Sequence, residues 1–335
     1  GAAGDDGGRM NASATGWHET GLAFECAGER LAGVLARPAA AQAACDVGVV
    51  VVVGGPQYRA GSHRLFVRLA RALAADGVPT LRFDVRGMGD STGTPAGFEA
   101  LDDDIAAAID SLQAACTTVR RVVLWGLCDG ASAALLYVQR AHDARVAALC
   151  LLNPWARTEH TLARARVRHY YLQRLVQPAF WRKLVVGRVA WSGLSELAAH
   201  LRTATGASPA DPLVSEPGYA VSMMRVLAAW RGPLLIALSG RDYTAREFEE
   251  LLARHPAARQ GLDSAGAGWR RYPSADHTFS DRAESEALVA DCRLWLAGLA
   301  GPSLPAAAAS PSARISISPT SDAPAARPQP APSSS

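Results

Sequence analysis

Short apolar runs alternate along the chain with longer segments whose apolar residues recur every three or four positions. The run at 47–53 consists of valines and one glycine, which is typical of a strand that helices bury on both faces. Further strands are predicted at 80–84, 122–126, 146–152, 234–238 and 269–272. Helices are predicted between them, at about 62–76, 101–115, 130–142, 245–254 and 280–299. This alternation predicts an α/β fold with a doubly wound, mostly parallel sheet.

The pattern has additions at its start and in its middle. Two short strands, 22–26 and 30–35, precede the first buried run. Ser62 is predicted to be the N-cap of the first helix. The alternation stops at Asn153-Pro154-Trp155, and residues 155–230 are helical in character. We therefore predict a helical cap inserted after the strand at 146–152.

The length fits one large α/β domain with an insertion, or two small domains. The chain has 335 residues, of which 49% are hydrophobic, so a sizeable core is available. We predict that the domain spans 19–300, and that residues 1–18 and 301–335 are disordered because they are small and polar or rich in Pro, Ala and Ser. The net charge of +3 does not indicate a nucleic-acid-binding protein.

The six cysteines form no C-x-x-C pair and no cluster with histidine. No metal is therefore expected, and no cofactor is indicated. Several cysteines lie in apolar runs, which suits reduced, buried thiols. The start of the chain lacks the pattern of a signal peptide, and the longest apolar run, 47–53, is too short to span a bilayer. We expect a cytoplasmic protein.

A candidate nucleophile lies between the strand at 122–126 and the helix that follows it. Gly126-Leu127-Cys128-Asp129-Gly130 has the form of a nucleophile elbow, with cysteine in the usual place of serine. Such a sharp turn strains its central residue, and neighbours with a Cβ would clash. Cys128 would lie at a helix N-terminus, which favours the thiolate. The alternative is that Cys128 is a small buried core residue.

Two residues later in the chain are candidate partners of this cysteine. Asp242 follows the strand at 234–238, and His277 follows the strand at 269–272. Catalytic groups gather beyond the carboxyl ends of such strands, and the order nucleophile, acid, histidine is that of α/β-hydrolases. We predict that His277 accepts the thiol proton, or holds a thiolate–imidazolium pair, and that Asp242 fixes its tautomer. Taken singly, Asp242 could be a helix-capping carboxylate and His277 a surface turn residue.

An oxyanion hole is expected from two backbone N–H groups. One belongs to Asp129, and the other comes from the loop after the first buried strand. Because Pro56 has no N–H, three donors remain in that loop, of which Gln57 is favoured: Gly55, Gln57 and Tyr58. The loop could instead be only a turn. Residues of the next loop are interpreted as structural: Asp84, Arg86, Gly87 and Gly89.

Seven segments carry a resemblance to a known family: 54–59, 83–91, 126–130, 153–159, 169–172, 239–242 and 275–279. Over about residues 20–300 the chain resembles the α/β-hydrolase superfamily, and more narrowly the exosortase A system-associated hydrolases of type 1. The narrower resemblance is specific because it extends into the inserted cap. It implies a bacterial protein encoded beside exopolysaccharide and protein-sorting genes, and it implies no particular substrate.

A cysteine nucleophile suits activated acyl groups, because a thiolate is both strongly nucleophilic and a good leaving group. The leading hypothesis is a thioesterase or esterase that acts on a small-molecule acyl substrate through a thioacyl-enzyme. One alternative is an acyltransferase, in which a sugar or other hydroxyl displaces water. The other is a non-catalytic binding protein on the same fold.

The predicted cap at 155–230 is rich in arginine and aromatic residues. Its basic face could hold an anionic head group, such as a phosphopantetheine or an acidic glycan, or contact an anionic membrane surface. The alternative is a solvated face with an aromatic underside. The oligomeric state is not indicated by the sequence.

Overall fold

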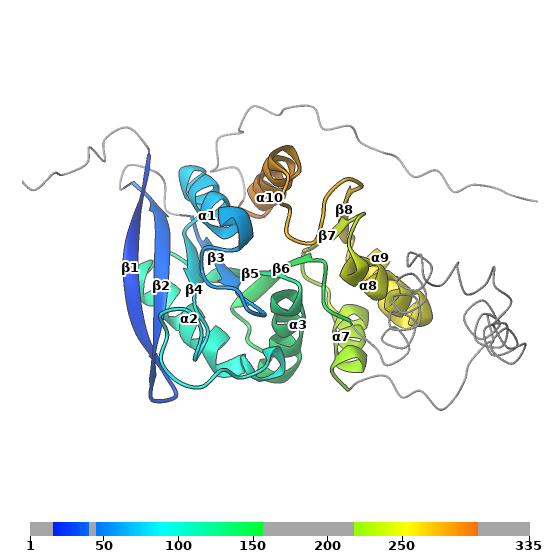
Figure 1. Cartoon of the computed structure of the whole chain (residues 1–335), viewed down its shortest axis with the longest axis horizontal. Helices are drawn as coiled ribbons and strands as arrows, with labels where there is room; N and C mark the ends of the chain where they lie inside the picture. Colours follow the sequence, from blue (N-terminus) through cyan, green and yellow to red (C-terminus); the bar gives the residue numbers. More distant parts are fainter. Residues whose placement is uncertain (1–15, 40–44, 157–217, 301–335) are drawn as a thin grey trace, which may run out of the picture.

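The computed structural model describes residues 16–39, 45–156 and 218–300, and Figure 1 shows their arrangement. Eight strands among these residues form one sheet in the order β1-β2-β4-β3-β5-β6-β7-β8. Neighbours from β4 to β8 run parallel, whereas β1–β2 and β2–β4 are antiparallel. The predicted doubly wound, mostly parallel sheet is confirmed. The strands are β1 (Trp17–Cys26), β2 (Glu29–Pro38), β3 (Val47–Val52), β4 (Thr80–Phe83), β5 (Arg121–Leu127), β6 (Val146–Leu152), β7 (Leu234–Ser239) and β8 (Gly268–Tyr272).

Helices cover both faces of this sheet (Figure 1). On one face lie α1 (Leu65–Ala75) and α10 (Arg282–Ala300). The other face carries α2 (Asp102–Ala115), α3 (Asp129–Ala141) and α7 (Gly218–Ala229). Four further elements are α8 (Tyr243–Arg254), α9 (Pro256–Ser264) and the 3-10 turns η1 (Ser62–Arg64) and η2 (Phe98–Ala100).

The valine run of β3 explains why two helical layers are needed. Val49 and Val51 pack into the apolar cluster that contains residues of α1 and α10. Val50 and Val52 pack into the opposite cluster, which contains residues of α2 and α3. All four side chains are fully buried. Successive side chains of a strand point to opposite faces, so a run without a polar position requires a buried environment on both sides.

Two predictions at the start of the chain are wrong. Trp17 and His18, which were assigned to the disordered segment 1–18, belong to β1 and pair with Pro38 and Arg37. Ser62 does not cap the first α-helix, because Ser62 lies in the turn η1 and α1 begins only at Leu65. Local composition gave no sign of either feature, since pairing with β2 and the turn geometry are set by contacts elsewhere in the fold.

Several predictions fall on residues outside the described ranges. The disorder of 1–15 and 301–335 and the cap between 157 and 217 belong to these. Within 218–230 the expected helical character is present as α7. Among the helices that the structure describes, none is both long enough and apolar enough to cross a bilayer.

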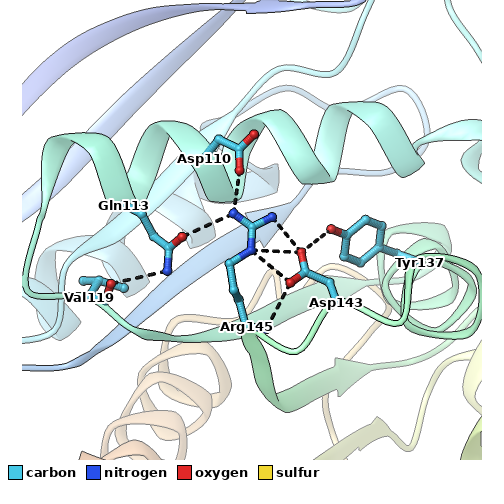
Figure 2. A network of polar contacts seen from close by, with 6 residues as sticks. All are labelled: Asp110, Gln113, Val119, Tyr137, Asp143 and Arg145. Atoms are coloured by element: carbon cyan, nitrogen blue, oxygen red, sulfur yellow. Dashed lines mark hydrogen bonds and ion pairs between the residues drawn. The ribbon is translucent and has the colours of Figure 1, made fainter.

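A polar network joins α2, α3 and the amino end of β6 (Figure 2). Because β5 and β6 are parallel and Cys128 follows the carboxyl end of β5, this network lies at the other end of the strands. Arg145 donates hydrogen bonds to Asp143 at the end of α3 and forms an ion pair with Asp110 of α2. The Tyr137 hydroxyl donates to the same Asp143 carboxylate at 2.6 Å. The hydrogen bond from Arg145 lowers the pKa of Asp143 to about 2, against the effect of burial. The network therefore ties two helices to the base of the strand that follows them.

Candidate active site

The turn at the end of β5 holds Cys128 in a strained conformation. Its φ is 59° and its ψ is −125°, directly before α3 begins at Asp129. A Cβ added to Gly126 would lie 2.5 Å from the backbone of Ala131, and one added to Gly130 would lie 2.4 Å from the Val52 oxygen. Both glycines are therefore required for the close approach of the chain. A non-glycine residue at positive φ is costly and is typical of functional sites.

Backbone hydrogen bonds fix this turn to the end of β6. The Cys128 N–H donates to the Leu152 oxygen at 2.9 Å, and the Trp155 N–H donates to the Cys128 oxygen at 3.2 Å. Cys128 itself is half-buried. It packs against the apolar cluster on the α1 and α10 side of the sheet.

Asp242 and His277 meet beyond the ends of β7 and β8. Asp242 Oδ1 accepts a hydrogen bond from the Thr244 N–H at the start of α8. Its Oδ2 lies 2.8 Å from His277 Nδ1. The Asp242 side chain is 6% exposed and the His277 side chain 33% exposed. The carboxylate is thus both a helix cap and the partner of the imidazole.

Two side chains act on the pKa of the His277 ring. Hydrogen bonds with Asp242, and secondly with the Cys128 side chain, raise the pKa of His277 to about 10, although burial opposes the shift. These contacts favour the protonated form of the ring. Among the described residues, no group of three or more His, Cys, Asp or Glu side chains is arranged to hold a metal ion.

The raised pKa of His277 predicts a pH-dependent contribution to stability. The pKa of His277 in the folded state is higher than its usual value of 6.5, so binding of the proton stabilises the folded state. This contribution to the free energy of unfolding is complete below about pH 6.5 and is lost as the pH rises through about 10. Asp242→Asn is expected to lower the free energy of unfolding by about 1–3 kcal/mol at pH 6, after allowance for solvent screening, and by less at pH 10. Urea unfolding at both pH values measures this.

A matched control for this experiment is Asp263→Asn, because Asp263 is an exposed aspartate on α9. Its effect is expected to stay within about 0.5 kcal/mol at both pH values. A loss of stability in Asp242→Asn that is the same at pH 6 and pH 10 would contradict the coupling between the carboxylate and the imidazole.

The loop after β3 meets the N-terminus of α3 at Asp129. A Cβ added to Gly54 would lie 2.2 Å from Asp129 Oδ1, and one added to Gly55 would lie 3.3 Å from Oδ2. The Asp129 carboxyl group accepts hydrogen bonds from its own N–H and from those of Gly55 and Gly130. The geometry therefore favours the Gly55 N–H as the second oxyanion donor, in place of the Gln57 N–H that the sequence favoured. Burial raises the pKa of Asp129, although these three donors act in the opposite direction.

The loop after β4 anchors the loop after β3. Asp84 is fully buried and accepts hydrogen bonds from the Arg59 N–H at 2.6 Å and from the Asp90 N–H at 3.0 Å. The Arg59 guanidinium pairs with Asp84 and Asp90. Gly89, at φ 54°, has no room for a Cβ against the Asp84 carboxylate. In the same loop, Arg86 pairs with the buried Asp104 of α2 at 2.8 Å. These contacts agree with the structural interpretation of the loop.

Sequence reasoning missed the role of Asn153 at the end of β6. This residue is fully buried at φ 41°. Its Oδ1 accepts from the Ser239 N–H at 2.8 Å, and its Nδ2 donates to Ser239 Oγ at 2.9 Å and to the His277 oxygen at 3.5 Å. Asn153 thus connects the ends of β6 and β7 to the histidine loop. An Asn-Pro pair after a buried strand was the available signal, since Asn tolerates positive φ.

Asp276 was also missed, although it precedes the candidate histidine. Its Oδ1 accepts hydrogen bonds from the N–H groups of Thr278 at 3.1 Å and Ser280 at 3.0 Å. Burial opposes ionisation, but the hydrogen bonds from Ser280 and Thr278 lower the pKa of Asp276 to about 2. The carboxylate fixes the turn that presents His277.

Comparison with solved structures agrees with this fold. An esterase from Pyrococcus furiosus matches with a TM-score of 0.57 at 15% identity, over 88% of this chain and 98% of that one. Est1E from Butyrivibrio proteoclasticus, bound to ferulic acid, matches with a TM-score of 0.53 at 16% identity, over 83% and 98%. An α/β serine hydrolase without a lid from Xanthomonas campestris matches with a TM-score of 0.51 at 16% identity, over 86% and 96%. At these identities the likeness concerns the fold. No curated protein matches the chain.

A family model gives the more specific assignment. The model described as serine aminopeptidase, S33, matches residues 46–232, which is more than half of the chain. The match includes the turn at Cys128 and ends before Asp242 and His277. The chain belongs to the serine aminopeptidase S33 family of α/β hydrolases.

Proposed function

We propose that the chain hydrolyses thioesters or activated esters with Cys128 as nucleophile, His277 as acid and base, and Asp242 as the residue that orients the histidine. One observation supports this most directly: His277 Nδ1 lies 2.8 Å from Asp242 Oδ2, and the Cys128 side chain is the second cause that raises the pKa of the same ring. The thiolate is the reactive form of a cysteine, and the proposal places His277 beside it as the group that carries the proton. The strained turn keeps that sulfur partly accessible.

The reaction would proceed in two balanced steps. The Cys128 sulfur attacks the acyl carbon, and the bond to the leaving thiol or alcohol breaks as His277 donates its proton to it. Water then gives a proton to His277 and attacks the thioacyl group, which releases the carboxylic acid and restores the thiolate. The backbone N–H groups of Asp129 and Gly55 would stabilise the oxyanion of each tetrahedral intermediate.

The substrate class follows from the nucleophile. A thiolate is a good leaving group, so the thioacyl-enzyme forms readily from acyl groups that are already activated. The resemblance to exosortase A system-associated hydrolases supports a role beside bacterial exopolysaccharide synthesis. A cytoplasmic location and contact between the cap and anionic lipid stay predictions, because the basic segment lies within 157–217, outside the described residues.

Intact-mass spectrometry with a panel of short-chain acyl thioesters tests this function. Rapid quenching is expected to show the protein heavier by one acyl group, with the adduct located on Cys128 and absent from Cys128→Ala. Cys116→Ala is the matched control, because Cys116 is another half-buried thiol, and it should still be acylated. Neither adduct nor turnover with any thioester or activated ester would favour a non-catalytic binding protein. Product formed at the expense of hydrolysis when a polyol is added would favour the acyltransferase.

A further inference from the structure

The Asp129 side chain lies against the loop after β3, which would supply one of the proposed oxyanion donors. Its Oδ1 would be 2.2 Å from a Cβ on Gly54, and its Oδ2 would be 3.3 Å from a Cβ on Gly55. The carboxyl group can approach this closely only because both positions of the β3 loop are glycine. It is half-buried between that loop and the first turn of α3.

The Asp129 carboxyl group also occupies the N–H donors that the proposed reaction requires. It accepts hydrogen bonds from the N–H groups of Asp129 and Gly55, the two proposed oxyanion donors, and from that of Gly130. A substrate carbonyl oxygen requires the same N–H groups at about 3 Å. The carboxyl group must therefore leave these donors before an oxyanion can occupy them.

The Asp129 side chain stays close to Cys128 even when its carboxyl group no longer accepts these hydrogen bonds. Aspartate has one methylene group and only two side-chain torsions, so every rotamer keeps the charge within a few ångströms of the neighbouring Cys128. The Asp129 carboxylate also interacts electrostatically with the His277 cation. The negative charge therefore offsets the attraction that the imidazolium would exert on an anion near the sulfur.

We propose that the Asp129 carboxylate closes the oxyanion site of the free protein and makes Cys128 discriminate against acyl substrates with a negative charge beside the scissile carbonyl. The favoured substrates are then neutral or cationic at that position. This assignment rests on the proposed function, because it requires Cys128 to be the reacting group.

Alkylation by two small reagents tests the inference without a known substrate. Iodoacetamide is neutral and iodoacetate is an anion of similar size, and each forms an S–C bond to the thiolate with loss of iodide. The ratio of the iodoacetate rate to the iodoacetamide rate at Cys128 is measured by peptide mass spectrometry. Asp129→Asn is expected to raise this ratio by about tenfold, because the carboxylate no longer repels the anion.

Two controls separate the charge of Asp129 from other effects. Asp263→Asn removes one exposed aspartate on α9 and is expected to leave the ratio at Cys128 unchanged. The half-buried Cys116 serves as an internal thiol whose ratio should be the same in every variant. Asp129→Ser, which keeps a residue suited to the start of a helix, gives a second neutral form if Asp129→Asn does not fold.

The outcomes distinguish this inference from the proposed function. Rapid alkylation of Cys128 by iodoacetamide, with the same reagent ratio in wild type, Asp129→Asn and Asp129→Ser, overturns the inference and leaves the nucleophile in place. Alkylation of Cys128 no faster than that of Cys116 in every form overturns the proposed function and the inference together. A ratio that rises in both Asp129 variants and not in Asp263→Asn supports the inference.

Discussion

Cys128→Ala is expected to lower kcat/KM for an acyl thioester by about 10⁴-fold or more, because the variant has no group that can form the thioacyl-enzyme. The remaining rate would come from binding and the oxyanion donors alone. Stability should change little, since the sulfur is half-buried at the end of the sheet and alanine at the same backbone geometry is no more strained than cysteine. Steady-state kinetics on purified wild type and variant, with thermal unfolding of both, measure the two effects.

Cys116→Ala is the control for this substitution, because it removes a half-buried thiol from the end of α2. It is expected to retain kcat/KM within about threefold of wild type. Full activity of Cys128→Ala would show that another group performs the reaction. An equal loss in Cys128→Ala and Cys116→Ala would point to damage to the fold and would also contradict a specific role for Cys128.

The strands that carry the candidate site could be predicted because their signal is local. The runs that became β5 and β7 are short and mostly apolar, the run that became β8 is short and combines aromatic residues with arginine, and each is followed within a few residues by a candidate catalytic residue. Parallel strands bring their carboxyl ends to one edge of a sheet. The order of Cys128, Asp242 and His277 along the chain therefore predicted that they would meet, and the Asp242–His277 contact is present at 2.8 Å.

The features that could not be predicted depend on contacts between distant segments. The Asp129 carboxyl group turns toward Gly54 and Gly55, a loop more than seventy residues earlier in the chain. Asn153 joins β6 to Ser239 and to the His277 loop through its side chain. Neither contact leaves a periodic signal, because hydrogen bonds from a single side chain to a distant backbone do not alter the spacing of apolar residues. The choice between Gly55 and Gln57 required the positions of both loops for the same reason.

The loop that carries the Gly55 N–H should depend strongly on the buried Asp84. Its carboxylate accepts the Arg59 and Asp90 N–H groups and pairs with the Arg59 guanidinium. Asp84→Ala would remove the acceptor of the two N–H groups and leave the Arg59 guanidinium with only the exposed Asp90 as its partner, and the loss of one partner of a buried ion pair costs about 3–5 kcal/mol. We expect that loss in the free energy of unfolding, measured by urea denaturation. We also expect a fall in kcat/KM of about tenfold or more, because the proposed oxyanion donor would be displaced.

Asp90→Ala provides a matched control on the same arginine. The Asp90 side chain is 70% exposed, whereas that of Asp84 is fully buried, so loss of the exposed pair is expected to cost less than about 1 kcal/mol. If the two variants lost the same stability, the buried carboxylate would not be the anchor of the loop. If Asp84→Ala lost stability but kept full kcat/KM, the loop after β3 would not supply an oxyanion donor, and the second N–H would have to come from elsewhere in the site.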